Sequence, residues 1–257
     1  MNTLIIGRIL DPPGIEYKST EKFDGNVKIL PQNPGKWFND RKHFVSGVKV
    51  ENWAFLNFAD LDDNACKEIQ KTFYNVGRDN GLFFSKGQSV LTIKAKIRNQ
   101  DEGLQKIENF LVKIKERFSS MGKATDLVII VLPFKAGIMY DKIKHVGDMK
   151  LNITTQCCLK QNLFKRGELS KQVIGNLCLK INSKLGGVNH VLASSCRPSM
   201  LKRPIMIMGA DVSHPAPEHR GMKPSIASVV ASMDPRYQIF HYLNLGTYKN
   251  VLIQEFI

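Results

Sequence analysis

Short apolar runs alternate with helical patterns along the chain between residues 47 and 185. We expect strands at residues 47–58, 89–98, 127–132 and 153–159. We expect helices at residues 63–80 and 101–118, around Tyr140, and at residues 170–185. Strands that alternate with helices form βαβ units, so the pattern predicts an α/β fold with a Rossmann-like open sheet of the parallel type. Ligands of such sheets bind beyond the carboxyl ends of the strands, where the loop at residues 133–140 would lie.

Residues suited to cap a helix lie at the expected ends of two of these helices. Asp60 or Asp62 can cap the helix at residues 63–80, and Gly81 ends it. Ser170 is suited to cap the last helix, and Gly186 lies just past its end.

Two lysines of the last helix lie close to its apolar side. At about 100° per residue, Lys184 falls in the arc between Val173 and Ile181, and Lys180 lies at the edge of that arc. One interpretation is that the lysine stems lie on the core while the ammonium groups reach water. The other is that an anion bridges the two like charges, and phosphate is the natural choice. Tyr140 and Lys144 are four residues apart, so they share one face of the preceding short helix.

The usual nucleotide-binding fingerprints are missing. No GxGxxG follows any expected strand, and the segment Gly122 to Thr125 fails the P-loop pattern. The sequence therefore argues against a dinucleotide enzyme or a nucleoside triphosphatase.

Charge and cysteine content limit the class of protein. The 37 basic and 23 acidic residues give a net charge of +14, which indicates a polyanionic partner, either nucleic acid or an acidic membrane surface. No apolar run approaches the roughly eighteen residues that span a bilayer, and we expect no signal peptide. The five cysteines include no CxxC pair, which favours reduced thiols in a cytoplasmic protein.

Four motifs in order resemble one family. They are Y-x-x-x-K-x-x-G-D from Tyr140, T-Q-C from Thr155, L-C-L-K-I-N-x-K-L-G-G-V-N from Leu177, and G-A-D-V-S-H-P from Gly209. This series resembles the MID domain and the start of the PIWI domain of eukaryotic Argonaute proteins. The resemblance implies a connector at residues 1–44, a MID domain at residues 45–200 and the N-terminal part of an RNase H-like PIWI domain at residues 201–257. It also implies a piece of a longer protein.

The resemblance assigns roles to individual residues. Tyr140 would stack on the first base of a guide RNA, in keeping with base stacking worth about 1–3 kcal/mol. The implied ligands of the guide 5′-phosphate are Lys144, Gln156, Lys180, Lys184 and, more weakly, Asn162. The loop at residues 133–139 is about one residue longer than the family pattern, which leaves the preferred first base open. No cofactor is implied for the MID domain.

Asp211 would be the first metal-binding carboxylate of the family's RNA-cleaving site. We expect strands at residues 204–211, 225–232 and 237–244, with Asp211 at the end of the first and His214 in the turn that follows. Asp211 could instead simply cap that turn. Cleavage needs two divalent cations held by several carboxylates, with Mg²⁺ or Mn²⁺ expected only in a complete PIWI domain. We therefore expect no cleavage by this chain alone.

Three functions remain open from the sequence. The first is a module that anchors the 5′ end of a small guide RNA and, with it, a target RNA. The second is an RNase H-like nuclease built on Asp211. The third is a scaffold for silencing cofactor proteins, although no residue singles out a surface for them.

Overall fold

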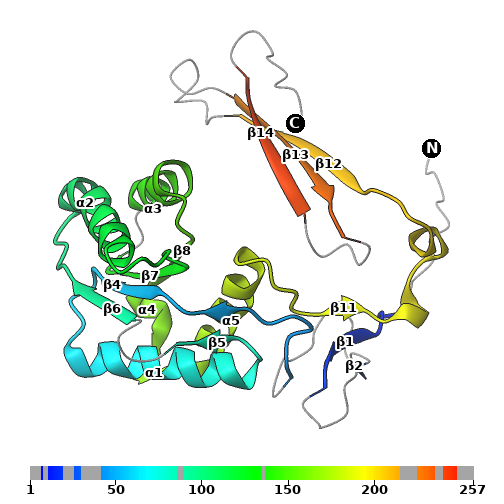
Figure 1. The fold of residues 1–257 in the computed structure, drawn as a ribbon, viewed down its shortest axis with the longest axis horizontal. Coiled ribbons are helices and arrows are strands. Elements are labelled where there is room, and N and C mark those ends of the chain that lie inside the picture. The colour runs from blue at the N-terminus through cyan, green and yellow to red at the C-terminus, as the bar shows by residue number, and fades with distance from the viewer. Residues whose placement is uncertain are drawn as a thin grey trace, which may run out of the picture. The chain divides into compact units, whose positions relative to one another are not determined.

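The computed structural model describes residues 7, 11–19, 26–29, 42–85, 90–134, 137–214, 225–234 and 240–247 (Figure 1). The chain divides into two compact units. The larger unit contains residues 17–27 and 37–190, and the smaller contains residues 1–16, 28–36 and 191–257. The division near residue 190 falls ten residues before the expected domain boundary. Phe44, which we expected at the end of a connector, is a buried member of the larger unit's core.

A four-stranded parallel sheet forms the centre of the larger unit. Its order is β6 (Val90–Lys94), β4 (Trp53–Asn57), β7 (Leu127–Leu132) and β8 (Thr155–Leu159). The sheet confirms the predicted Rossmann-like fold, and β7 has the predicted bounds. In this order β8 has one neighbour, β7, so β8 forms an edge of the sheet.

Helices cover both faces of this sheet, as Figure 1 shows. Strand residues alternate between two buried clusters: Ile129 packs with α1 (Asp63–Asp79) and α5 (Lys171–Lys184). Ile130 packs with α2 (Gln100–Ser119) and α3 (Gly137–Lys144) on the other face. All six residues of β7 are buried, which explains its continuous apolar sequence. The edge strand β8 therefore runs between a layer that contains α3 and a layer that contains α5.

The structure chooses between the two expected caps of α1. The Asp62 side chain accepts a hydrogen bond from the Ala65 amide at 2.7 Å. Asp60 has a φ of 54° and pairs with Lys96. At α5, the Ser170 hydroxyl accepts from the Val173 amide at 3.4 Å, and Gly186 follows with a φ of 83°, as predicted.

The short helix α3 continues directly into a π-helix at His145–Leu151. Lys144 is thus the last residue of α3, at the point where the helical hydrogen bonding changes. After β8 the chain forms α4 (Lys160–Leu163) and the hairpin of β9 (Phe164–Lys165) and β10 (Glu168–Leu169).

Small elements complete the description. β3 (Lys49–Val50) pairs in parallel with β5 (Phe83–Phe84), and β1 (Ile15–Lys18) pairs antiparallel with β11 (Val191–Leu192). The remaining elements are β2 (Asn26–Ile29) and 3-10 helices at Ser194–Cys196 and Ser199–Lys202. β1 follows Pro12 and Pro13 in the sequence. No helix of the described part is both long and apolar enough to cross a membrane.

Three antiparallel strands form the sheet of the smaller unit, in the order β12 (Met208–Ser213), β13 (Ser225–Ser232) and β14 (Phe240–Thr247). β13 has its predicted bounds. The position predicted for Asp211 at a strand end is wrong, because Asp211 pairs with Ser228 and the ladder continues through Ser213.

Candidate functional site

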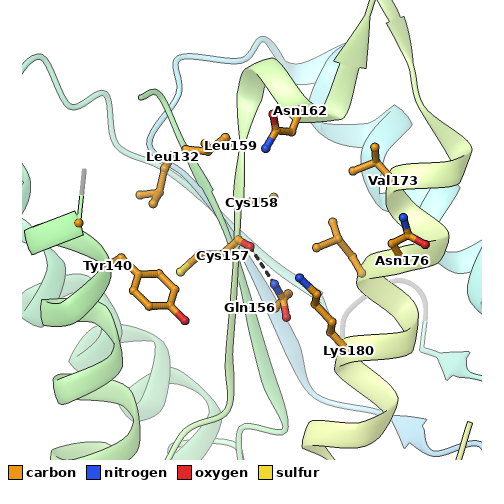
Figure 2. Close-up of a pocket in the computed structure, with 12 residues that line it drawn as sticks. Leu132, Tyr140, Gln156, Cys157, Cys158, Leu159, Asn162, Val173, Asn176 and Lys180 are labelled. Carbon is orange, nitrogen blue, oxygen red and sulfur yellow. Dashed lines mark hydrogen bonds between the residues drawn. The ribbon is translucent and has the colours of Figure 1, made fainter. Parts of the chain in front are cut away.

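A pocket of about 470 Å³ lies beside the outer edge of β8, between α3 and α5 (Figure 2). Tyr140 borders it from α3, Gln156 from β8 and Lys180 from α5. Its other lining residues are Leu132, Gly137, Cys157, Cys158, Leu159, Asn162, Val173, Asn176 and Leu177. The pocket thus joins three separate elements of the larger unit and combines an apolar wall with a few amide, phenol and ammonium groups.

The Tyr140 ring faces the pocket from the α3 side, as Figure 2 shows. The residue is 46% exposed, so a planar ligand can reach the ring. Burial of the hydroxyl raises the pKa of Tyr140, which keeps the phenol neutral at physiological pH. The Lys144 ammonium lies 6.0 Å from the ring centroid. Aromatic and cationic groups therefore lie side by side, as the spacing of the two residues predicts.

Lys144 and Lys184 converge on one residue of β8. The Lys144 Nζ donates to the carbonyl oxygen of Thr155 at 2.8 Å and to its hydroxyl at 2.7 Å. The Lys184 Nζ donates to the same carbonyl at 2.9 Å. Two cations from different helices thus share one acceptor.

This convergence lowers the proton affinity of Lys184. Burial, followed by the neighbouring positive charge of Lys144, lowers the pKa of Lys184 to about 8. Lys184 is an exposed residue, but the hydrogen bonds of its ammonium end are partly buried. A bound anion would reverse both effects, because it offsets the desolvation and separates the like charges.

Gln156 is fixed in orientation at the base of the pocket. Its side-chain oxygen accepts from the Lys184 Nζ at 2.9 Å, and its amide nitrogen donates to the Cys157 carbonyl at 2.8 Å (Figure 2). The residue is only 5% exposed. The neighbouring Cys157 is a neutral thiol, because burial raises its pKa to about 11.

Lys180 and Asn162 line the same pocket from α5 and α4. Asn176 also lines it and was not among the residues predicted from the sequence. Asn176 lies one helical turn before Lys180, so the same periodicity that places Lys180 at the edge of the apolar stripe could have identified it.

Lys180 lines the pocket, while Lys144 and Lys184 are not lining residues but contact Tyr140 and Gln156, which are. All three lysines lack acidic partners among the described residues. Six ion pairs are formed in that part of the chain, and none includes Lys144, Lys180 or Lys184. Other lysines nearby are paired: Glu108 of α2 binds Lys142 and Lys150, which lie on either side of Lys144 in sequence. Hydrogen bonds from Lys150 and then Lys142 lower the pKa of Glu108 to about 2. The positive charge of the pocket is therefore available to an anionic ligand.

Asp211 belongs to the smaller unit. Its carboxylate accepts a hydrogen bond from the Val212 amide at 2.8 Å. Within the described ranges, no three His, Cys, Asp or Glu side chains gather into a metal-binding group. The carboxylates described there do not fit a two-metal centre, and His214 instead contacts the Ser225 hydroxyl at 2.8 Å.

Comparisons with known proteins agree on one fold. Residues 127–250 match the model of the Piwi domain. The C-terminal lobe of a budding yeast Argonaute is 24% identical with a TM-score of 0.67, over 93% of this chain and 49% of that one. Kluyveromyces polysporus Argonaute with a guide RNA is 22% identical with a TM-score of 0.69, over 97% of this chain and 28% of that one.

A third structure, the MID-PIWI domains of N. crassa QDE-2, is 22% identical with a TM-score of 0.55, over 78% of this chain and 52% of that one. The chain therefore spans about half the length, or less, of these relatives. The shared fold is a Rossmann-like domain followed by the first strands of an RNase H-like domain.

Proposed function

Because the chain belongs to the Argonaute family, we propose that it binds a small guide RNA for RNA silencing and holds the guide 5′ end in the pocket between α3 and α5. The observation that carries this proposal is a set of three lysines without acidic partners in the described structure, gathered around a pocket that an accessible tyrosine ring borders. Charged donors bind phosphate strongly, and an aromatic ring provides a stacking surface for a base.

Each group has a distinct part in the proposed complex. Lys144 and Lys184 share the Thr155 carbonyl, so their ammonium groups present concentrated positive charge to a terminal phosphate. Lys180 of α5 and Asn162 of α4 line the pocket and would bind phosphate oxygens there. Tyr140 would stack on the first base. Pairing of the guide with a target RNA would take place beyond this anchored end.

The direct test compares two oligoribonucleotides that differ only at the 5′ end. We expect the 5′-phosphorylated form to bind this chain at least tenfold more tightly than the 5′-hydroxyl form, because one or more charge-assisted hydrogen bonds of about 1.5–3 kcal/mol are lost without the phosphate. Fluorescence anisotropy at fixed salt measures both affinities. Equal affinities would leave only general attraction to a basic protein, which weakens steeply with salt, and would refute the pocket.

Replacement of Tyr140 tests the stacking role. Tyr140→Ala is expected to weaken binding of the phosphorylated RNA by about 1–3 kcal/mol, whereas Tyr140→Phe should retain most of the affinity because it keeps the ring. Phe83→Ala removes an equally exposed ring outside the pocket and serves as the control, since Phe83 is 49% exposed. Similar losses for Tyr140→Phe and Tyr140→Ala would mean that the hydroxyl, and not the ring, carries the effect.

The pH dependence of binding follows from Lys184. Its pKa of about 8 in the free protein means that the ammonium is charged below that pH and neutral above it. A 5′-phosphate becomes dianionic above about pH 6. We therefore expect the preference for phosphorylated RNA to be greatest between about pH 6 and 8 and to decline above pH 8, measured as the ratio of the two affinities. In Lys184→Met, the decline near pH 8 should disappear. An unchanged decline in that variant would assign it to another group.

A further inference from the structure

We propose that Thr155 is a positioning residue, whose hydroxyl and carbonyl together hold Lys144 and Lys184 in the geometry that receives the phosphate. This inference rests on the proposed function and adds a residue that would not itself touch the RNA. Thr155 is the first residue of β8 and is fully buried. It accepts three hydrogen bonds from two ammonium groups, at 2.7, 2.8 and 2.9 Å.

Each of the two lysines has one N–H donor left to bind a ligand. An ammonium group has three N–H donors. Lys144 directs two of them to Thr155, and Lys184 directs one to Thr155 and one to Gln156. Among the hydrogen bonds of the described residues, the third donor of each lysine has no protein acceptor. An anion that meets both remaining donors would complete the bonding of both cations at once.

Thr155 is held in place by its strand pairing and by its packing. Its backbone is fixed by pairing with Val128 of β7. Its methyl group packs against the π-helix: a Cβ added to Gly147 would lie 2.9 Å from the Thr155 Cγ2, closer than such atoms approach. With the methyl on that side, the hydroxyl is directed to Lys144 at the end of α3. The absence of a side chain at Gly147 thus leaves room for the Thr155 methyl group, while the Thr155 hydroxyl binds Lys144.

The neutral acceptors of Thr155 are what allow two like charges to stay together without a ligand. An unpaired, partly buried ammonium is costly unless it is hydrogen-bonded. A carboxylate at this position would supply the bonds but would also neutralise the charge that the phosphate needs. A carbonyl and a hydroxyl supply them and leave the charge in place. The site is therefore preorganised for a dianion.

Thr155→Val tests this inference, because valine keeps the shape and the backbone carbonyl and removes only the hydroxyl acceptor. We expect the preference for 5′-phosphorylated over 5′-hydroxyl RNA to fall about tenfold, the usual effect of one hydrogen bond to a charged group. Affinity for the 5′-hydroxyl RNA should stay within about twofold. Thr155→Ser retains the acceptor and should restore most of the preference. Thr154→Val, the same exchange one residue earlier, is the matched control, with no expected change.

A second measurement separates this inference from the proposed function. NMR of the lysine ammonium groups in the RNA-free protein should show that Thr155→Val changes the chemical shift of the Lys144 Nζ and speeds exchange of its protons with water, because that ammonium loses an acceptor. Thermal unfolding checks that each variant folds. An unchanged Lys144 resonance and exchange rate, or equal losses of binding preference in the valine and serine variants, would overturn the role of the hydroxyl. Equal wild-type binding of the two RNAs would instead refute the phosphate site, while the NMR measurement still decides whether Thr155 holds Lys144.

Discussion

Replacing Lys180 and Lys184 together with alanine is expected to erase the preference for 5′-phosphorylated RNA that we propose for this chain. Both lysines extend from α5 toward the edge of β8, Lys180 along the pocket wall and Lys184 to the Thr155 carbonyl and the Gln156 side chain. Each charge-assisted hydrogen bond to the phosphate contributes about 1.5–3 kcal/mol. The loss of two such bonds should weaken binding of the phosphorylated RNA by roughly a hundredfold or more, as measured by fluorescence anisotropy.

The matched control lies on the same helix. Lys171 begins α5 and is exposed, so Lys171→Ala removes an equal charge outside the pocket. We expect this variant to bind both RNAs slightly more weakly, to the same extent, and to leave the ratio of the two affinities unchanged. If Lys171→Ala reduced the ratio as much as the double variant does, the preference would arise from the overall positive charge and not from the pocket.

Phe55→Ala is expected to produce the largest loss of stability. Phe55 lies in β4, the strand between β6 and β7, and its side chain is fully buried in the cluster that α1 and α5 share. Truncation of a buried phenylalanine costs about 3–5 kcal/mol, from lost burial and from the cavity that remains. Small domains have a total stability of only about 5–15 kcal/mol. Urea denaturation followed by circular dichroism measures the change in the free energy of unfolding.

Phe83→Ala is the control for this prediction as well. Phe83 lies in β5 and is 49% exposed, so its truncation should change the free energy of unfolding by less than about 1 kcal/mol. A loss at Phe55 no larger than the loss at Phe83 would mean that β4 is not the centre of the larger unit's core. Because α5 packs on that core, Phe55→Ala should also weaken RNA binding at temperatures where the variant is partly unfolded.

Local features of the sequence were sufficient to predict most elements. The apolar run at Leu127–Leu132 is bounded by Asp126 and Pro133, and it forms β7 with the predicted ends. Ser170 and Gly186 delimit α5 as expected, since caps depend on the few residues next to a helix end. Where two caps were equally suited in sequence, only the backbone at Asp60 and Asp62 distinguished them.

Strand ends and shared acceptors were harder to predict. Asp211 was expected to end its strand, but pairing with β13 extends β12 to Ser213, and pairing depends on a partner strand. Thr155 begins the T-Q-C motif, but its role as a shared acceptor could not be predicted from the sequence, because two of its three hydrogen bonds are accepted by a backbone carbonyl that every residue has.

The sequence by itself determined the α/β class, the order of the helices and strands, and the side chains with the chemistry to bind a phosphate and a base. These properties follow from local periodicity and from residue type. Only the tertiary structure decided that β8 is the edge strand, that α3 and α5 flank it, and that Lys144 and Lys184 meet at Thr155. Such convergence depends on pairing between strands distant in sequence, which no local pattern contains.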